Sequence, residues 1–404
     1  MPHERARHLS RLLQKTFKYS PITGILGHRQ VGKTTLATSL GGAYVTLDLA
    51  QDHASANLVP EAFLASLSEQ KRGTPDFPAV IDECQLAPPL FPALKEWVRL
   101  HKRPGQFTIT GSVRFTSRKA IRESLTGRII TWELLPMDWS EQHSQPLPAT
   151  VLNLLVGRKL DMDLSNAASF TPQAYRRALE NGGLPGVFAV RDAVIRAQRF
   201  ETQLNTILER DLRLIIDTSV PYKNLRSLLS GLASQVGHPL NLKNLVKVSG
   251  ISLPTVRKLI SAFEALFLIR FVDSEGDYQK PIVFFEDIGE MNHLTKEPLP
   301  ENRKLLAFLY QNLRTQWHYR PDEQCRAFQF RKRSGCEIPL CISRGKDLLG
   351  LIPLSDPDGL ADAVKNARLF LKVRPDAKIL IVSSADCDQM ISKQIRWLGA
   401  GRLL

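Results

Sequence analysis

Residues 27–34 constrain this chain more than any other feature, because they read Gly-His-Arg-Gln-Val-Gly-Lys-Thr and match GxxxxGK[ST] completely. The apolar run Ile22–Leu26 precedes them, and a helix is expected over Thr34–Leu40. Between a strand and a helix, the glycines of such a loop let successive backbone N–H groups point inward at phosphate oxygens. The motif therefore predicts a nucleoside triphosphate site in an α/β domain.

The loop side chains have separate expected tasks. Lys33 is expected to reach the β- and γ-phosphates of ATP, and the Thr34 hydroxyl to ligate Mg²⁺. The residues predicted to bind the nucleotide are Gly27, His28, Arg29, Gln30, Val31, Gly32, Lys33, Thr34 and Thr35.

A second motif supports the same chemistry. The apolar run Ala79–Asp82 ends in two carboxylates, Asp82 and Glu83. Asp82 is expected to hold Mg²⁺ through water, and Glu83 to orient and polarise the attacking water. Thr110 and Ser112 end another expected strand, where a hydroxyl can bond the γ-phosphate or the attacking water. Capping of the next turn is the alternative role for Thr110.

Arg128 is a candidate arginine finger that enters the site of a neighbouring subunit. This role predicts a homo-oligomer. The alternative is a contact of Arg128 to phosphate or carboxylate with no catalytic role.

Expected strands alternate with helices through the first part of the chain, which predicts a parallel sheet covered on both faces. The expected strands are Ile22–Leu26, Tyr44–Asp48, Ala79–Asp82 and Phe107–Thr110, with a helix over Pro89–Leu100.

Residues Asn241–Leu266 read as helix, glycine turn and helix, and Phe267–Val272 as a strand, which is the outline of a winged helix. Such a fold docks its second helix in the major groove of DNA, or serves as a protein-contact module. Arg257 and Lys258 are expected to point outward from the second helix and to contact nucleic acid.

The formal charge of +14 and the pI near 9.7 favour polyanionic partners such as DNA. The stretch Lys95–Arg128 is especially rich in Lys and Arg. A basic amphipathic helix near Leu9–Phe17 fits either a membrane or nucleic-acid surface, or simple packing on the next domain. Five cysteines without a CxxC pair fit a reducing cytosol, so a cytoplasmic protein is expected. No apolar run reaches the roughly 18 residues of a membrane span.

These motifs, taken in order, resemble a prokaryotic family of AAA-type ATPases fused to a C-terminal domain similar to PD-(D/E)xK nucleases. The resemblance covers about residues 20–290. It is carried by the phosphate loop and by Ile81–Gln85, Leu94–Lys95, Thr110–Ser112, Ser124–Arg128, Gly182–Pro185, Glu209–Asp211 and Lys280–Phe285.

The resemblance implies four regions. They are a P-loop ATPase domain (1–141), a linker and helical lid (142–217), a winged-helix domain (218–276) and a nuclease-like α/β domain (277–404). Glu337 is the one acidic residue at the expected metal position of the last region, and Pro339 stands where an aspartate would be needed, so we expect this region to be inactive as a nuclease.

Two functions remain open. The first is an ATPase that couples nucleotide turnover to remodelling of DNA or a partner. The second is an ATP-gated DNA-binding regulator or defence sensor with little turnover.

Overall fold

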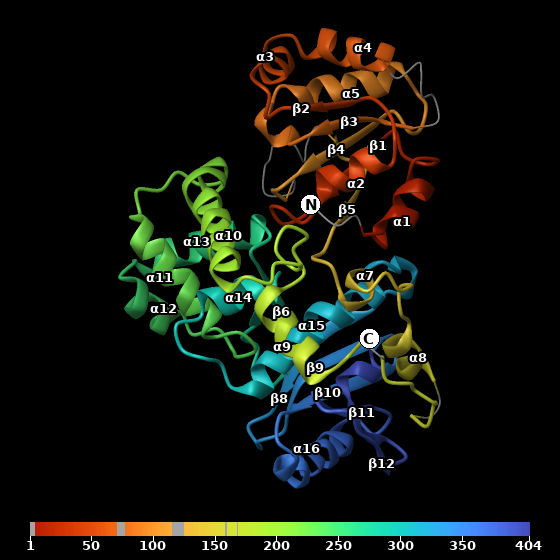
Figure 1. Ribbon diagram of the computed structural model, residues 1–404, viewed down its shortest axis with the longest axis vertical. Coiled ribbons are helices and arrows are strands. Elements are labelled where there is room, and N and C mark those ends of the chain that lie inside the picture. Colours follow the sequence, from red (N-terminus) through yellow and green to blue (C-terminus); the bar gives the residue numbers. More distant parts are fainter. Residues whose placement is uncertain (1–4, 71–76, 115–124, 158–159, 168) are drawn as a thin grey trace. The chain divides into compact units, whose positions relative to one another are not determined.

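The computed structural model describes residues 5–70, 77–114, 125–157, 160–167 and 169–404. The chain divides into two compact units, and each unit is assembled from several stretches of sequence (Figure 1). The first comprises Met1–Leu135, Asn205–Asp217 and Ser261–Leu268, and the second comprises Pro136–Leu204, Thr218–Ile260 and Ile269–Leu404.

The first unit is built on a five-stranded sheet in the order β2-β3-β4-β1-β5. Every neighbouring pair is parallel, as the alternation of strands and helices predicted. Because all strands point the same way, the loops that follow β1, β3 and β4 meet at one edge of the sheet. The strands are β1 (Ile22–Leu26), β2 (Tyr44–Thr46), β3 (Ala79–Asp82), β4 (Phe107–Gly111) and β5 (Ile129–Glu133).

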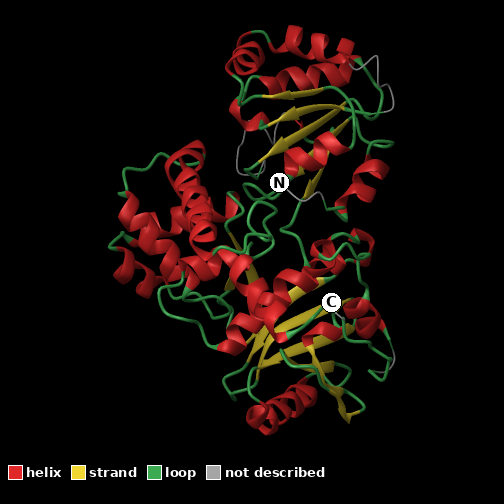
Figure 2. Cartoon of the chain, in the orientation of Figure 1, coloured by secondary structure: helices red, strands yellow, loops and turns green. Residues whose placement is uncertain are grey.

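Helices cover both faces of this sheet (Figure 2). Leu64 and Leu67 of α4 and Phe91 and Leu94 of α5 bury their side chains in one core with strand residues such as Ile109. Removing these apolar surfaces from water stabilises the sheet. The helices are α1 (Leu9–Thr16), α2 (Lys33–Ser39), α3 (Ala50–Leu58), α4 (Pro60–Gln70) and α5 (Leu90–Leu100).

The basic N-terminal helix α1 packs on the first unit. Leu9 and Leu13 are fully buried, and Thr16 accepts a hydrogen bond from Trp132 Nε1 of β5 at 2.8 Å. Of the two alternatives expected for this helix, a surface for membrane or nucleic acid and packing on the next domain, the structure shows packing.

Two later segments return to the first unit. One holds the π-helix η4 (Ile207–Asp211) and the 3-10 helix η5 (Leu212–Leu214). The second segment, Ser261–Leu268, contains the last turns of α13 (Leu253–Ala265). Its Phe267 side chain is buried in the core beside β4 and α5. The Arg114 guanidinium lies 4.2 Å from the centre of the Phe267 ring. The backbone N–H of Arg114 donates to the Ala265 carbonyl. Residues far along the chain thus complete the core beside the five-stranded sheet.

The second unit contains an eight-stranded mixed sheet in the order β12-β13-β11-β10-β9-β8-β6-β7. β6 forms an antiparallel hairpin with β7 and pairs in parallel with β8, so this sheet runs across the boundary expected at residue 276. Its strands are β6 (Ile269–Gly276), β7 (Ile282–Phe285), β8 (Arg326–Arg331), β9 (Glu337–Arg344), β10 (Asp347–Leu354), β11 (Lys378–Ser383), β12 (Asp388–Ser392) and β13 (Ile395–Gly399).

The helices of the second unit include α12, which ends at the glycine turn expected from the sequence, with Gly250 in the left-handed region at φ 67°. None of the helices in the described parts of the chain combines the length and the apolar character that a membrane span requires. The helices are α7 (Trp139–Gln142), α8 (Thr150–Val156), α9 (Pro172–Asn181), α10 (Ala193–Thr206), α11 (Tyr222–Ala233), α12 (Leu242–Ser249), α14 (Ile288–Leu294), α15 (Glu301–His318) and α16 (Leu360–Val373).

Candidate functional site

The phosphate loop follows β1 at the edge where the strands of the first unit end. Gly27 has φ 153°, and a Cβ atom there would lie 2.5 Å from the Leu134 carbonyl oxygen. Gly32 has φ 97° and leads into α2. Only glycine fits both positions without strain, which explains the two glycines of the motif.

Lys33 lies inside the loop and is only 4% exposed. Its ammonium group donates to the carbonyls of Gly27 at 3.1 Å and His28 at 2.9 Å. Burial lowers the pKa of Lys33, while the nearby carboxylates of Glu83 and Asp82 act in the opposite direction. A buried ammonium at the mouth of a curled loop is suited to an anionic phosphate.

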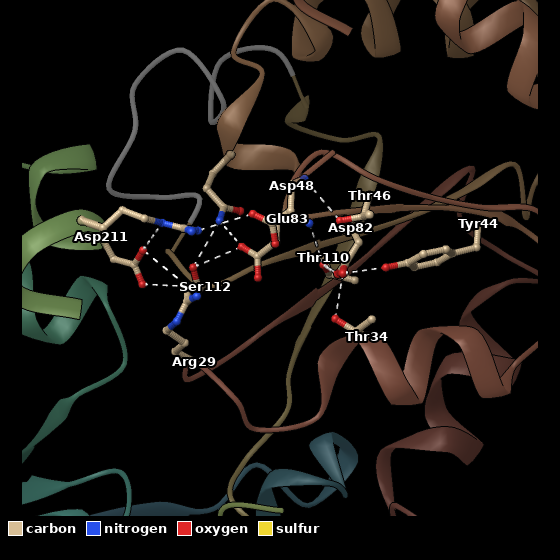
Figure 3. Close-up of polar contacts among 12 residues, drawn as sticks. Arg29, Thr34, Tyr44, Thr46, Asp48, Asp82, Glu83, Thr110, Ser112 and Asp211 are labelled. Carbon is tan, nitrogen blue, oxygen red and sulfur yellow. Dashed lines mark hydrogen bonds and ion pairs between the residues drawn. The ribbon is translucent and has the colours of Figure 1, made fainter. Parts of the chain in front are cut away.

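In Figure 3 the side chains of Thr34, Tyr44 and Thr110 all point toward the carboxylate of Asp82. The Thr34 hydroxyl donates to Asp82 Oδ2 at 2.7 Å, and the Thr110 hydroxyl donates to Oδ1. The Tyr44 hydroxyl also donates to Oδ2, at 3.1 Å. Burial and the Asp82 carboxylate raise the pKa of Tyr44 to about 12, so its hydroxyl keeps its proton at neutral pH. The structure therefore brings together Thr34, Asp82 and Thr110, which the sequence placed on three separate segments.

Glu83 follows Asp82 in the left-handed region, at φ 55°. A non-glycine residue in this region is uncommon and turns the side chain away from the path of the strand. Glu83 Oε2 accepts hydrogen bonds from the Gln85 amide and, at 3.4 Å, from the Ser112 hydroxyl. The Glu83 backbone N–H donates to Thr110 Oγ1 at 3.1 Å. Thr110 thus contacts both carboxylate residues of the second motif.

An ion pair connects the phosphate loop to η4. Arg29 Nη1 lies 3.2 Å from Asp211 Oδ2, and the Asp211 side chain is only 1% exposed. Arg210 contacts the same carboxylate at 3.2 Å and reaches Asp48 at 3.6 Å. The sequence motifs assign no role to Asp211, although Glu209–Asp211 is one of the segments that carry the family resemblance.

Arg7, which precedes α1, contacts the backbone of the phosphate loop. Its guanidinium donates to the Val31 carbonyl at 2.7 Å and to the Leu135 carbonyl at 2.5 Å. Both contacts are with backbone atoms, which leave no trace in the sequence pattern.

Three other residues that were predicted to bind the nucleotide lie in the phosphate loop or at the start of α2. Gln30 is in the left-handed region at φ 60°, and His28 is 1% exposed and bonds the Arg29 carbonyl through Nδ1. Thr35 lies on the exposed side of α2.

Arg128 lies apart from these groups. It directly precedes β5, whose first residue pairs with Ile22 and whose last pairs with Leu26. It is therefore at the opposite end of the strands from the phosphate loop, about 15 Å away at roughly 3.3 Å per residue. Its guanidinium donates to the Thr126 carbonyl. Ser124, part of the same motif, is outside the described residues.

Arg257 and Lys258 are both exposed on α13, whereas Val256 and Leu259 on the same helix are buried. Their predicted outward direction is confirmed. Residues 115–124 of the basic stretch Lys95–Arg128 are outside the described part of the chain.

Three acidic residues of the second unit make structural contacts within that unit. Glu286 pairs with Arg270 and Arg314, and Asp287 caps α14 and accepts from the Gly183 N–H. Glu337 contacts Gln329 and Arg331. Among the residues that the structure describes, no group of three or more His, Cys, Asp and Glu side chains could hold a metal.

Pro339 lies inside β9, a strand with a neighbour on each side. The ladder between β9 and β10 ends at Leu340, and the pairing with β8 shifts between Phe328 and Phe330. Pro339 therefore falls where no regular ladder bond is needed, as expected for proline in a sheet.

Comparison with known proteins agrees with the geometry of the first unit. Residues 19–143 match a family described as an AAA domain, and residues 172–297 match a domain family of unknown function. Residues 19–143 therefore form a domain of the AAA type, a class that binds nucleotides, usually with Mg²⁺.

Two curated relatives are uncharacterized proteins of Mycobacterium bovis and Mycobacterium tuberculosis. Each is 27% identical over 290 residues, which make up 70% of this chain and 58% of the relative. The chain thus spans little more than half the length of these relatives.

Two solved structures are similar at lower levels. A Pyrococcus horikoshii signal transduction ATPase with a tetratricopeptide repeat sensor is 14% identical, with a TM-score of 0.27, over 80% of this chain and 50% of the other. The Hsp104–ADP complex of Saccharomyces cerevisiae is 15% identical, with a TM-score of 0.30, over 80% of this chain and 45% of the other. Scores this low carry no argument about function.

Proposed function

We propose that this protein hydrolyses ATP in the first unit. The observation that carries the proposal is the joining of the two motifs through Asp82, whose carboxylate accepts from Thr34 of the phosphate loop and from Thr110 of β4. Lys33 would bind the β- and γ-phosphates, and Glu83 would accept a proton from the water that attacks the γ-phosphorus.

The Thr34 hydroxyl and the Asp82 carboxylate fit Mg²⁺, because this ion prefers oxygen ligands and takes one or two from protein beside those of phosphates and water. When bound, the ion would neutralise charge on the phosphate oxygens. The chain's own task is to hold these two oxygens at the end of β3 and the start of α2.

The test is an assay of ATP binding and of phosphate release, with and without DNA, in parallel with a measurement of molecular size. Lys33→Ala should abolish tight ATP binding, because the phosphates lose a buried positive charge. Phosphate release that persists at the normal rate in Lys33→Ala would contradict the assignment. ATP turnover that rises when DNA is added favours an ATPase that remodels DNA or a partner. A change of DNA affinity upon ATP binding, with negligible ATP turnover, favours the ATP-gated regulator or sensor.

DNA is the second proposed partner, and the exposed pair Arg257 and Lys258 on α13 supports it. The helices α12 and α13, followed by the β6–β7 hairpin, are compatible with a winged-helix reader, and the second sheet with an inactive nuclease-like domain. Affinity for duplex DNA should fall with salt, with a log–log slope of roughly −0.9 per phosphate contact. The double variant Arg257→Ala, Lys258→Ala should bind DNA more weakly and ATP normally. Equal DNA affinity would exclude α13 as the reader.

A further inference from the structure

Gln85 lies directly beside the carboxylate of Glu83. It belongs to the 3-10 helix η2 (Cys84–Leu86) and is 1% exposed. Its amide nitrogen donates to Glu83 Oε2 and, at 3.2 Å, to Ser112 Oγ. We propose that Gln85 is a positioning residue that fixes the Glu83 carboxylate toward the attacking water. This inference rests on the proposed function, because it concerns the same hydrolytic site.

The contacts to the Glu83 carboxylate are unequally divided between its two oxygens. Gln85 and Ser112 both donate to Oε2, and no contact from the described residues reaches Oε1. One oxygen is therefore anchored by protein, and the other is left to accept from a water. A general base acts only within hydrogen-bond reach of the proton it takes, so an anchored carboxylate spends more time in the productive orientation.

An amide is well suited to this position. It donates to a carboxylate without adding a positive charge, which would neutralise the base that hydrolysis requires. Ser112 is also buried, at 2% exposure, and ties the Gln85 amide to the end of β4. The group Glu83, Gln85 and Ser112 thus connects the ends of β3 and β4 at the edge where the phosphate loop lies.

Gln106 provides a matched control for a glutamine-to-alanine change. It is 2% exposed and donates to the carbonyls of His101 and Arg103 at 2.6 and 2.7 Å. It precedes β4 and is therefore at the opposite edge of the same sheet. Both Gln85→Ala and Gln106→Ala remove a buried hydrogen-bonding amide, but only Gln85→Ala alters the surroundings of Glu83.

The experiment measures kcat, KM and binding of a fluorescent ATP analogue for the full chain. Gln85→Ala should lower kcat about 10- to 100-fold, as expected for a misplaced catalytic group, while analogue binding and KM stay close to the wild type. Gln106→Ala should retain the wild-type kcat. Retained analogue binding in Gln85→Ala also shows that the first unit is folded.

A second comparison separates positioning from support of the fold. If Gln85 acts only through the carboxylate of Glu83, Gln85→Ala should cost little further kcat once Glu83→Gln has removed that carboxylate. An equal fold-loss of kcat from Gln85→Ala in the wild type and in Glu83→Gln would indicate a structural role and overturn the proposal.

The proposal and the function on which it rests fail in different ways. If the wild type hydrolyses ATP and Gln85→Ala does so equally fast, only the role of Gln85 is overturned. If the wild type binds ATP and never hydrolyses it, the proposed function is overturned, and the positioning role falls with it.

Discussion

Asp211 follows Arg29 by 182 residues, yet its carboxylate lies 3.2 Å from the guanidinium of Arg29 in the phosphate loop. Asp211 also acts on Lys33: its negative charge raises the pKa of that lysine, whereas Arg29 lowers it. A buried carboxylate from η4 is therefore part of the electrostatic environment into which the phosphates of ATP would enter.

This relationship predicts that Asp211→Asn binds ATP more tightly. The change removes a negative charge that would repel the phosphates, and it lets Arg29 turn toward them. We expect the Kd for ATP to fall about 3- to 10-fold at low salt, where such charge effects are least screened. Asp388→Asn is the matched control, because Asp388 is also paired with an arginine, Arg396, but belongs to the second unit. Weaker binding in Asp211→Asn would mean that the pair serves chiefly to shape the loop.

The lowered pKa of Lys33 predicts a pH dependence of ATP binding. The protonated lysine attracts phosphate, and burial makes it lose its proton below the ordinary value of 10.5. The Kd for ATP should therefore rise as the pH increases from neutrality through the lowered pKa. Lys33→Arg should bind ATP less well, because its planar guanidinium fits the loop poorly, but with little dependence on pH. Titration of a fluorescent ATP analogue tests this, and a wild-type Kd that stays constant up to about pH 10 would contradict it.

Asp82→Asn should reduce the effect of Mg²⁺ on ATP binding. The amide keeps the shape of the side chain but supplies no negative charge to the ion. We expect the gain in affinity upon addition of Mg²⁺ to fall about tenfold, a loss of roughly 1.4 kcal/mol. Binding in EDTA should match the wild type, which controls for the fold. An unchanged response to Mg²⁺ would remove Asp82 from the metal site.

Arg128 is at the opposite end of β5 from the phosphate loop of its own chain, so a catalytic role for it requires a second copy. Arg128→Ala and Lys33→Ala should each be inactive, and their mixture should recover part of the activity. An arginine finger contributes roughly 10³ to 10⁵ in rate, so even a small fraction of complete sites is measurable. An active monomer, or no recovery despite demonstrated co-assembly, would exclude the role in trans.

The first sheet could be predicted largely from the sequence, because its strands are short apolar runs that end at chemically distinctive residues. Ala79–Asp82 is observed with the predicted bounds, and Ile22–Leu26 likewise. β5 was not predicted, since Ile129–Glu133 mixes apolar and polar residues and is only partly buried. The long helix α15 was also missed, because its segment includes many polar side chains that are buried in the structure.

Within the candidate site, the sequence identified residues that belong to recognisable motifs. It could not pair Arg29 with Asp211 or Arg7 with the Val31 carbonyl, because such contacts join distant segments and leave no local periodicity. Gln85 belongs to Ile81–Gln85, one of the segments that carry the family resemblance, and its contact with Glu83 gives this position a physical role. The pairing of β6 with β8 in the second sheet was not predicted either, because it also joins segments that are distant in the sequence.

The most direct test of ATP hydrolysis at this site is the rate of phosphate release at saturating ATP for the wild type and Glu83→Gln. The amide keeps the size of the side chain but cannot accept a proton as a carboxylate does. We predict that Glu83→Gln binds ATP with the wild-type Kd and loses about 10²- to 10⁴-fold in kcat, the usual contribution of a general base. Phosphate release from Glu83→Gln at the wild-type rate would contradict the assignment of Glu83 as the catalytic base.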